Sequence, residues 1–172
     1  MGAFVITVSI VSHGHGCMID ALLGDLAGCP EVTRVVLTIN VPEQEPVVPA
    51  ALAGRAVVLR NAAPKGFGAN HNAAFAHCDT PYYCVLNPDV RFDANPFPAL
   101  LGCLKDGVTL CAPAVTSPAG EIEDSARHFP GFLGLIAKLL GVADGRYRYA
   151  RTDPPFHPDW VAGMFMLFVA AD

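Results

Sequence analysis

Hydrophobic residues come in short unbroken runs along this chain, and loops rich in glycine, proline and polar residues separate them. The first run, Phe4–Val11, is rich in β-branched residues and is typical of a strand buried on both faces. Runs of the same kind predict further strands. These are Val32–Ile39, Ala56–Leu59, Tyr82–Leu86, Val108–Val115 and Trp160–Ala170.

Helical spacing of apolar residues predicts a helix over Met18–Ala27, which Gly28 ends. Asn95 is predicted to cap another helix, with Pro96 in its first turn and Gly107 after its end. Two more helices are expected at Ala69–Ala76 and Phe132–Leu140.

The alternation of strands and helices predicts an α/β fold, a mostly parallel sheet with helices on both faces. Ligands bind beyond the carboxyl ends of the strands in such sheets. Four polar loops should therefore be neighbours at one edge of the sheet. They are "SHGHG", "NVPE", "RNAAPKGFGANHN" and "NPD".

The composition narrows the class of protein. A chain of 172 residues, 52% hydrophobic and 16% charged, is expected to form one folded domain with a core. Its net charge of -5 argues against a nucleic-acid partner, because phosphate backbones require a basic face. The six cysteines form no Cys-x-x-Cys pair and no signal peptide precedes them, so reduced thiols in the cytoplasm are expected.

The stretch "APKGFGANHNAAF" carries glycines at a spacing that invites comparison with phosphate-binding loops. It lacks the Gly-Lys-Ser/Thr ending of a Walker loop, and His71 stands where the dinucleotide fingerprint has its third glycine. Gly66 and Gly68 would still let a ligand approach the backbone, in front of a helix whose free N–H groups favour anions. The alternative is an ordinary tight loop with an asparagine capping the helix.

Asp89 follows the strand Tyr82–Leu86 directly after a proline. A carboxylate at that edge can hold Mg2+ or Mn2+, which take oxygen ligands and bridge phosphate oxygens. One carboxylate makes a metal site only if the substrate supplies the other ligands, as a diphosphate does. The alternative is that Asp89 hydrogen-bonds within its own turn.

Five segments, taken in order, resemble the large inverting glycosyltransferase family with the GT-A fold, and most closely its branch of bacterial rhamnosyltransferases and related cell-surface polysaccharide enzymes. The segments are "VSIVSHGH", "RNAAPKGFGANHNAAF", "VLNPDV", "APAVTSPAGEIEDSAR" and "VAGMFMLFVAAD". The resemblance runs along nearly the whole chain. It implies a Rossmann-like nucleotide-sugar-binding domain, a divalent metal, and transfer with inversion from a nucleotide-diphosphate sugar to a hydroxyl of a glycan or a lipid-linked acceptor.

Carried over residue by residue, the resemblance implies that Asp89 binds the metal and that Ser12 and His13 lie by the nucleotide base. The remaining residues expected to line the donor site are Asn40, Lys65, Gly66, Phe67, Gly68, Asn70, Asn72 and Gly163. Trp160 is expected to frame the donor sugar together with Gly163.

The chain departs from the family pattern at two places. Ile39 stands where the family often has an acid that contacts the base or ribose, which leaves Asn40 and Glu43 for that contact. The family's general base follows the last matching strand, and this chain ends at Asp172, so the catalytic base and the acceptor segment are expected beyond it. Residues 1–172 are thus expected to bind the donor without efficient transfer. The alternative is a non-catalytic nucleotide-sugar-binding module.

Several other residues leave alternatives open. His13 and His15 could share a zinc ion, although nucleotide contact or simple loop polarity is favoured. His71 could approach the diphosphate or lie on the helix surface, and Arg127 could reach donor phosphates or pair with Glu123 or Asp124. The apolar stretch "GFLGLIAKLLG" could lie on the inner face of the cell membrane, form a core helix, or cover a patch that the segment expected beyond Asp172 would bury; the last interpretation is favoured. An oxidoreductase or hydrolase of similar fold is disfavoured, since the dinucleotide fingerprint is incomplete and no Gly-x-Ser-x-Gly elbow is present.

Overall fold

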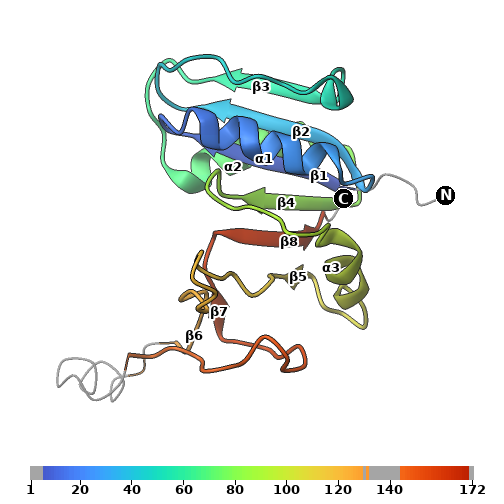
Figure 1. Ribbon diagram of the computed structural model, residues 1–172, viewed down its shortest axis with the longest axis vertical. Coiled ribbons are helices and arrows are strands. Elements are labelled where there is room, and N and C mark those ends of the chain that lie inside the picture. The colour runs from blue at the N-terminus through green and yellow to red at the C-terminus, as the bar shows by residue number, and fades with distance from the viewer. Residues whose placement is uncertain (1–5, 130, 132–143, 171–172) are drawn as a thin grey trace. The chain divides into compact units, whose positions relative to one another are not determined.

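The computed structural model describes residues 6–129, 131 and 144–170 (Figure 1). These residues form two compact units. The sheet unit comprises residues 6–111 and 163–170, and the small unit comprises the described residues between 112 and 162. The predicted helix Phe132–Leu140 lies outside the described residues.

The sheet unit is built on a six-stranded, mostly parallel sheet, as the alternation of elements predicts. The strand order is β3-β2-β1-β4-β8-β5. β1 to β4 are mutually parallel, whereas β8 runs antiparallel to both of its neighbours. The strands are β1 (Ile6–Ser12), β2 (Val32–Ile39), β3 (Ala56–Arg60), β4 (Tyr82–Leu86), β5 (Leu110–Cys111) and β8 (Phe165–Val169).

Alternate side chains of β1 divide the two faces of the sheet. Ile6, Val8 and Ile10 belong to the main apolar core, which α1 (Cys17–Ala27) and α3 (Phe97–Cys103) also enter. Helix α1 contributes four fully buried side chains, spaced as the sequence predicts: Ile19, Leu22, Leu23 and Leu26. The intervening residues, Thr7 and Ser9, are polar and fully buried on the other face.

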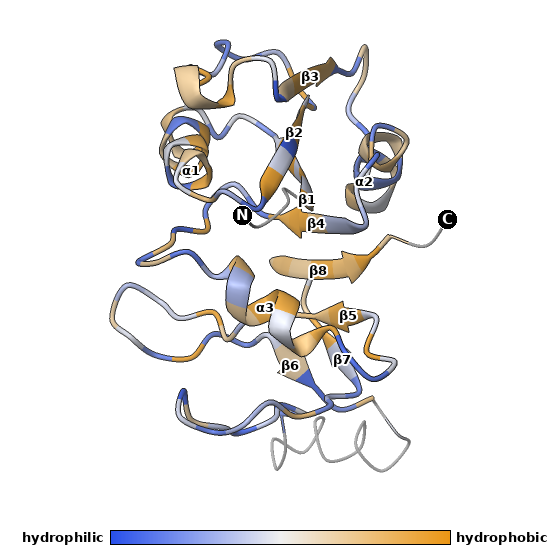
Figure 2. Ribbon diagram, turned by 90° about the vertical axis from the view of Figure 1, so that its right-hand side faces the viewer, coloured by the Kyte–Doolittle hydropathy of each residue, from blue (hydrophilic) through white to orange (hydrophobic). Residues whose placement is uncertain are grey.

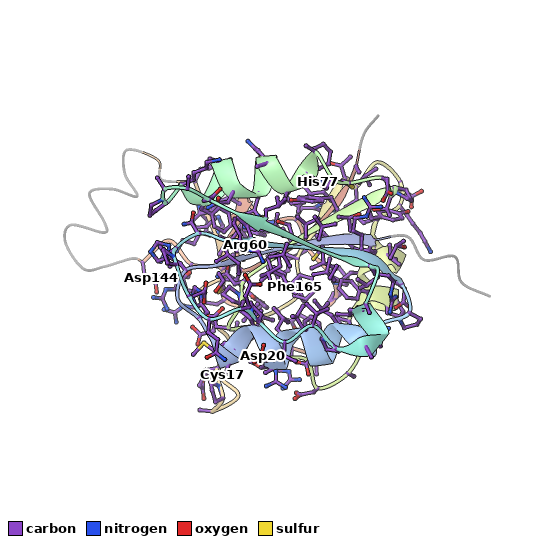
Figure 3. The ribbon with its side chains drawn as sticks, turned by 90° about the horizontal axis from the view of Figure 1, so that it is seen from above. Cys17, Asp20, Arg60, His77, Asp144 and Phe165 are labelled. Carbon is purple, nitrogen blue, oxygen red and sulfur yellow. The ribbon has the colours of Figure 1, made fainter. Side chains whose placement is uncertain are left out.

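Helix α2 (Phe67–Phe75) covers that other face, so helices lie on both sides of the sheet as expected (Figures 2 and 3). Polar contacts attach it there. Ser9 and His71 share a hydrogen bond, and the hydroxyl of Tyr83 donates to the carbonyl oxygen of His71. The two faces thus differ: one is packed by aliphatic residues and the other is held partly by hydrogen bonds.

Four predicted elements differ from the structure. Helix α3 has Pro96 and not Asn95 as its N-cap residue, and it ends at Cys103, before the expected stop at Gly107. The strand expected over Val108–Val115 is reduced to β5, because β5 pairs with β8 at only two positions. The strand expected over Trp160–Ala170 is interrupted: β7 (Trp160–Val161) belongs to the small unit and β8 to the large sheet. Helix α2 begins two residues earlier than expected, which takes Gly68 out of the loop and into the first helical turn.

The small unit is centred on β6 (Ala126–Arg127), which pairs with β7 in an antiparallel ladder. The chain around Arg146 lies on the other side of β6, since the amide of Tyr147 donates to the carbonyl of Ala126. The segment "SPAGE" forms a turn, with the amide of Gly120 donating to the carbonyl of Ser117.

Candidate donor-binding site

The strand register brings the expected site residues to one edge of the large sheet. Ser12 is opposite Ile39 on β2, and Ile39 is opposite Arg60 on β3, so Asn40 and Asn61 both follow directly at the edge. The last residue of β4, Leu86, is opposite Phe165, the first residue of β8. The turn after β4 and the residues before β8 therefore share this edge. The amide of Asn87 donates to the carbonyl of Met164 at 2.8 Å, which fixes the two together.

Three asparagines form a hydrogen-bonded network at this edge, and two of them, Asn40 and Asn70, are buried. Asn61 Nδ2 donates to Asn40 Oδ1 at 2.8 Å and to Asn70 Oδ1 at 2.7 Å. Asn40 also accepts from the amide of Lys65, and Asn40 and Asn70 both donate to the carbonyl of Lys65. Asn40 and Asn70 are 4% and 1% exposed. Their side chains therefore shape the glycine loop from beneath.

Asn61 is the member of this network that the sequence analysis did not single out. The sequence feature that could have indicated Asn61 is its place directly after the short strand β3, which corresponds to the place of Asn40 after β2. Asn72 lies apart from the network, because its side chain is exposed on α2.

The glycine loop ends in a helix N-terminus, as expected for an anion-binding element. Gly66 is the N-cap residue with φ -69° and extended backbone, a conformation open to any residue. The first amides of an α-helix lack partners within the helix, so those of residues 67–69 are oriented toward the edge. Lys65 is exposed beside them and adds one positive charge.

Phe67 and Gly163, both expected to line the donor site, lie in contact. A Cβ added at Gly163 would be 2.8 Å from Phe67 Cζ, so only glycine leaves room for the ring in this position. Phe67 is 51% exposed, and its other edge packs on His71 with ring centroids 4.4 Å apart. The ring is thus supported from below and open above.

His71 is not a surface residue. It is buried beneath Phe67, and its Nδ1 is 2.8 Å from the hydroxyl of Ser9. Burial lowers its pKa to about 4, because an imidazolium loses its hydration there. His71 is therefore neutral near pH 7 and cannot supply charge to a diphosphate. The surface position considered for it from the sequence was wrong, whereas its approach to a diphosphate stays a prediction.

The loop after β1 is held by a carboxylate. Glu43 accepts from the amides of Gly14 and Gly16, each at 3.3 Å. Burial acts to raise the pKa of Glu43, but hydrogen bonds from Ser12, Gly16 and Gly14 and the nearby His15 outweigh it and hold the pKa below the usual value. Glu43, which the sequence offered for base or ribose contact, is thus occupied in shaping this loop.

His13 is exposed at the tip of the same loop and touches the asparagine network. Its Nδ1 accepts from Asn40 Nδ2 at 3.0 Å, and its amide donates to His15 Nδ1 at 2.8 Å. Across residues 6–129, 131 and 144–170, no three His, Cys, Asp or Glu side chains come together as a metal cluster. A zinc site at His13 and His15 therefore gains no third ligand from the described chain.

Asp89 lies in the turn after β4, and its side chain is exposed. The turn itself is closed by backbone atoms, since the amide of Val90 donates to the carbonyl of Asn87 at 3.4 Å. A single exposed carboxylate fits the way Mg2+ is commonly held, by one or two carboxylates together with substrate phosphates. The donor set therefore fits a metal that arrives with a diphosphate.

Two expected residues fall in the small unit. Arg127 pairs with Asp124, where Nε to Oδ1 is 2.9 Å, so its ion-pair role is confirmed. The guanidinium also lies 5.9 Å from the centre of the Trp160 ring.

No helix within the described part of the chain combines the length and apolar character needed to cross a bilayer.

No protein-family model and no curated protein sequence matches this chain. Among solved structures it is similar to the mannosyltransferase PcManGT from Pyrobaculum calidifontis, in complex with GDP-Man and Mn2+. The TM-score is 0.54 at 16% sequence identity, over 66% of this chain and 36% of the mannosyltransferase chain. This chain therefore matches about a third of that protein's length. At this identity the comparison establishes the fold: a six-stranded, mostly parallel α/β sheet of the kind found in a glycosyltransferase.

Proposed function

We propose that the sheet unit is the donor-binding part of a metal-dependent glycosyltransferase with the GT-A fold. Its substrate is a nucleotide-diphosphate sugar, and the sugar is transferred with inversion to a hydroxyl of a glycan or a lipid-linked acceptor. The resemblance of the motifs supports a place in cell-surface polysaccharide synthesis, with rhamnose as the sugar of the most similar branch.

A single observation carries this proposal. The carboxyl ends of β1, β2, β3 and β4 and the start of β8 share one edge, and the motif residues occupy that edge. Cation-binding, amide and aromatic groups are thereby available together: Asp89, the N-terminus of α2, and Phe67 against Gly163. A nucleoside diphosphate that carries a sugar presents the matching chemistry.

The solved mannosyltransferase supports the metal and the donor class, because it is in complex with GDP-Man and Mn2+. In this chain Asp89 would hold the cation. When bound, the cation would neutralise charge on the diphosphate oxygens.

The described residues of the edge have separate parts in this proposal. Departure of the nucleoside diphosphate increases negative charge on a phosphate oxygen, and the first amides of α2 and Lys65 would stabilise that charge. Phe67 would give the sugar or base an aromatic surface, while the Asn40–Asn61–Asn70 network keeps the Lys65 loop in place.

Calorimetry on residues 1–172 tests the donor site. UDP, GDP and dTDP are titrated with and without Mn2+, and we expect at least one to bind in a metal-dependent manner. Asp89→Asn should weaken that binding by about tenfold or more, since it removes the charged ligand. Asp93→Asn is the matched control, because Asp93 is exposed in the same loop four residues later.

Metal-independent binding, or equal affinity of the Asp89→Asn and Asp93→Asn variants, would reject the role of Asp89. Transfer is tested separately, with a chain that extends past residue 172. Such a chain should transfer sugar from the bound donor, and substitution of its general base should abolish transfer while donor binding persists. A longer chain that binds the donor and transfers nothing would favour the non-catalytic module.

A further inference from the structure

The small unit contains a cavity, and none of the residues that line it belongs to the edge of the large sheet. It has a volume of about 280 Å³ and is lined by the strand region 122–126 and by residues 144 and 146–149. These two stretches are neighbours because β6 pairs with the chain around Arg146. The volume is close to the lower end of ordinary small-molecule sites.

Aromatic rings form one wall of this cavity and support each other. Tyr147 and Tyr149 line it, and the ring of Phe156 packs against both, with centroids 5.3 Å and 5.1 Å away. His128 stacks on Tyr147 with ring centroids 3.7 Å apart and an interplanar angle of 30°. Rings fixed in this way present a flat apolar surface at little cost in side-chain entropy.

Carboxylate and guanidinium groups contribute much of the remaining lining, together with Ile122, Ser125 and Ala126. Asp124 is bound by Arg127 and, at 3.2 Å, by Nε of Arg146. Ser125 Oγ lies 3.0 Å from the hydroxyl of Tyr149, so these two groups are held as well. Arg148 also lines the cavity, and its side chain is exposed. The lining thus offers hydrogen-bond acceptors and donors next to each other.

The charges of the lining decide which ligand it suits. Glu123, Asp124 and Asp144 contribute carboxylates, and Arg146 and Arg148 contribute guanidiniums. The additional positive charge of Arg127 is directed to Asp124, so the lining has no excess of positive charge. Phosphate or sulfate requires such an excess, whereas a neutral ligand does not.

We propose that this cavity binds a neutral saccharide unit. A pyranose has an apolar C–H face that can lie against Tyr147 or Tyr149, and hydroxyls at its rim that can pair with carboxylate and guanidinium groups. The assignment of this saccharide as part of the acceptor rests on the proposed function, and it differs from the expectation that the acceptor segment follows Asp172. Saccharide binding itself is independent of the proposed function, since every group involved belongs to the small unit.

Saturation-transfer NMR on residues 1–172 tests the proposal. The probes are the methyl glycosides of rhamnose, mannose, galactose and N-acetylglucosamine, with inorganic phosphate as the anionic comparison. We expect at least one glycoside to bind with a dissociation constant on the order of 1 mM and phosphate to bind more weakly. Amide shifts in a labelled sample should fall in residues 122–126 and 146–149.

Arg148→Gln should weaken glycoside binding by about tenfold, because a charged donor is lost. Arg151→Gln is the matched control, since Arg151 is exposed three residues later and does not line the cavity. Binding by none of the four glycosides, tighter binding of phosphate, or equal effects of the two substitutions would overturn the proposal. Calorimetry with nucleoside diphosphates and Mn2+ on the same samples distinguishes the two proposals. If the chain binds a glycoside but no nucleoside diphosphate, the proposed function is rejected and saccharide binding by the cavity is not.

Discussion

At the scale of single residues, the contact between Gly163 and Phe67 sets the shape of the proposed donor site. A methyl group at position 163 would be 2.8 Å from Phe67 Cζ and 3.2 Å from Cε1. The atoms it meets belong to the far end of a half-exposed side chain, so the ring can turn away without disturbing the core. A methyl group at position 163 should therefore change ligand binding more than it changes the free energy of unfolding.

We therefore predict that Gly163→Ala weakens metal-dependent nucleotide binding about tenfold and changes the melting temperature by only about 2 °C. In a Phe67→Ala background, the same substitution should have no further effect on affinity, because the displaced ring is absent. Calorimetry and thermal unfolding of the four proteins in this cycle provide the measurement. Additive losses would show that the two residues act separately.

His71 gives a prediction on pH. Its pKa is lowered from 6.5 to about 4 by burial, so below pH 6.5 the unfolded chain binds a proton that the folded chain refuses. The free energy of unfolding should consequently decrease as the pH falls from 6.5 toward 4, by about 2 kcal/mol from this residue.

His71→Asn removes this titration and should make the decrease between pH 7 and pH 4.5 smaller by that amount. His157→Asn, at an exposed position, is the control and should follow the unmodified chain. Urea unfolding at both pH values measures the difference. Parallel pH dependence in all three proteins would contradict the burial of His71 as its cause.

At the scale of elements, the asparagine network joins the ends of β2 and β3 to the start of α2. Asn61 is its centre, because both hydrogens of its amide are donated to neighbouring asparagine oxygens. Asn61→Asp replaces those donors with a carboxylate that faces two acceptor oxygens. We predict a loss of about 3 kcal/mol in the free energy of unfolding and weaker nucleotide binding, since the Lys65 loop is no longer anchored.

The comparison for that substitution is Gln44→Glu, which makes the same amide-to-acid change at an exposed site. It should leave the free energy of unfolding within about 0.5 kcal/mol of the original. Equal effects at positions 61 and 44 would mean that the network contributes no stability.

The elements also show what the pattern of hydrophobic residues could predict. The predicted bounds of β2 are those observed, because its run of strand-forming residues is unbroken and a polar residue follows it. The predicted start of α1 is one residue away from the observed start, because its apolar residues have helical spacing and glycine ends the helix. The strand predicted over Val108–Val115 was too long. A strand needs a pairing partner, and β8 pairs with this run only at Leu110 and Cys111. The interruption around Gly163 was equally invisible, because it depends on pairing partners far away in the sequence: β7 pairs with β6, and β8 pairs with β4 and β5.

The site could be predicted in its location but not in its internal contacts. Topology alone placed the four loops at one edge, which the strand register confirms. Sequence reasoning assigned Asn40 and Asn70 to the ligand, whereas their side chains bond chiefly to Asn61 and the Lys65 backbone. Burial of His71 could not be foreseen, since it follows from a serine, Ser9, on a strand 62 residues away.

At the scale of the whole molecule, the residues proposed to bind the metal and the diphosphate all belong to the sheet unit, whereas Trp160, expected beside the donor sugar, belongs to the small unit. Every residue that lines the proposed saccharide cavity also belongs to the small unit. Replacement of residues 112–162 by a flexible linker of about ten residues should therefore leave a folded sheet that binds nucleotide with metal within about threefold of the intact chain. The same replacement should abolish glycoside binding. Circular dichroism and calorimetry check both parts, and a deleted chain that is unfolded would refute the independence of the two units.

The position of β8 has a consequence for the order of assembly. It is the last described strand in the chain, yet it lies inside the sheet, between β4 and β5. Among the described residues β5 pairs only with β8, so residue 169 must leave the ribosome before β5 can pair. Until then the side of β4 that faces away from β1 is an open strand edge. A nascent chain stalled near residue 130 should already protect β1 to β3 from proteolysis while it depends on a chaperone to cover β4.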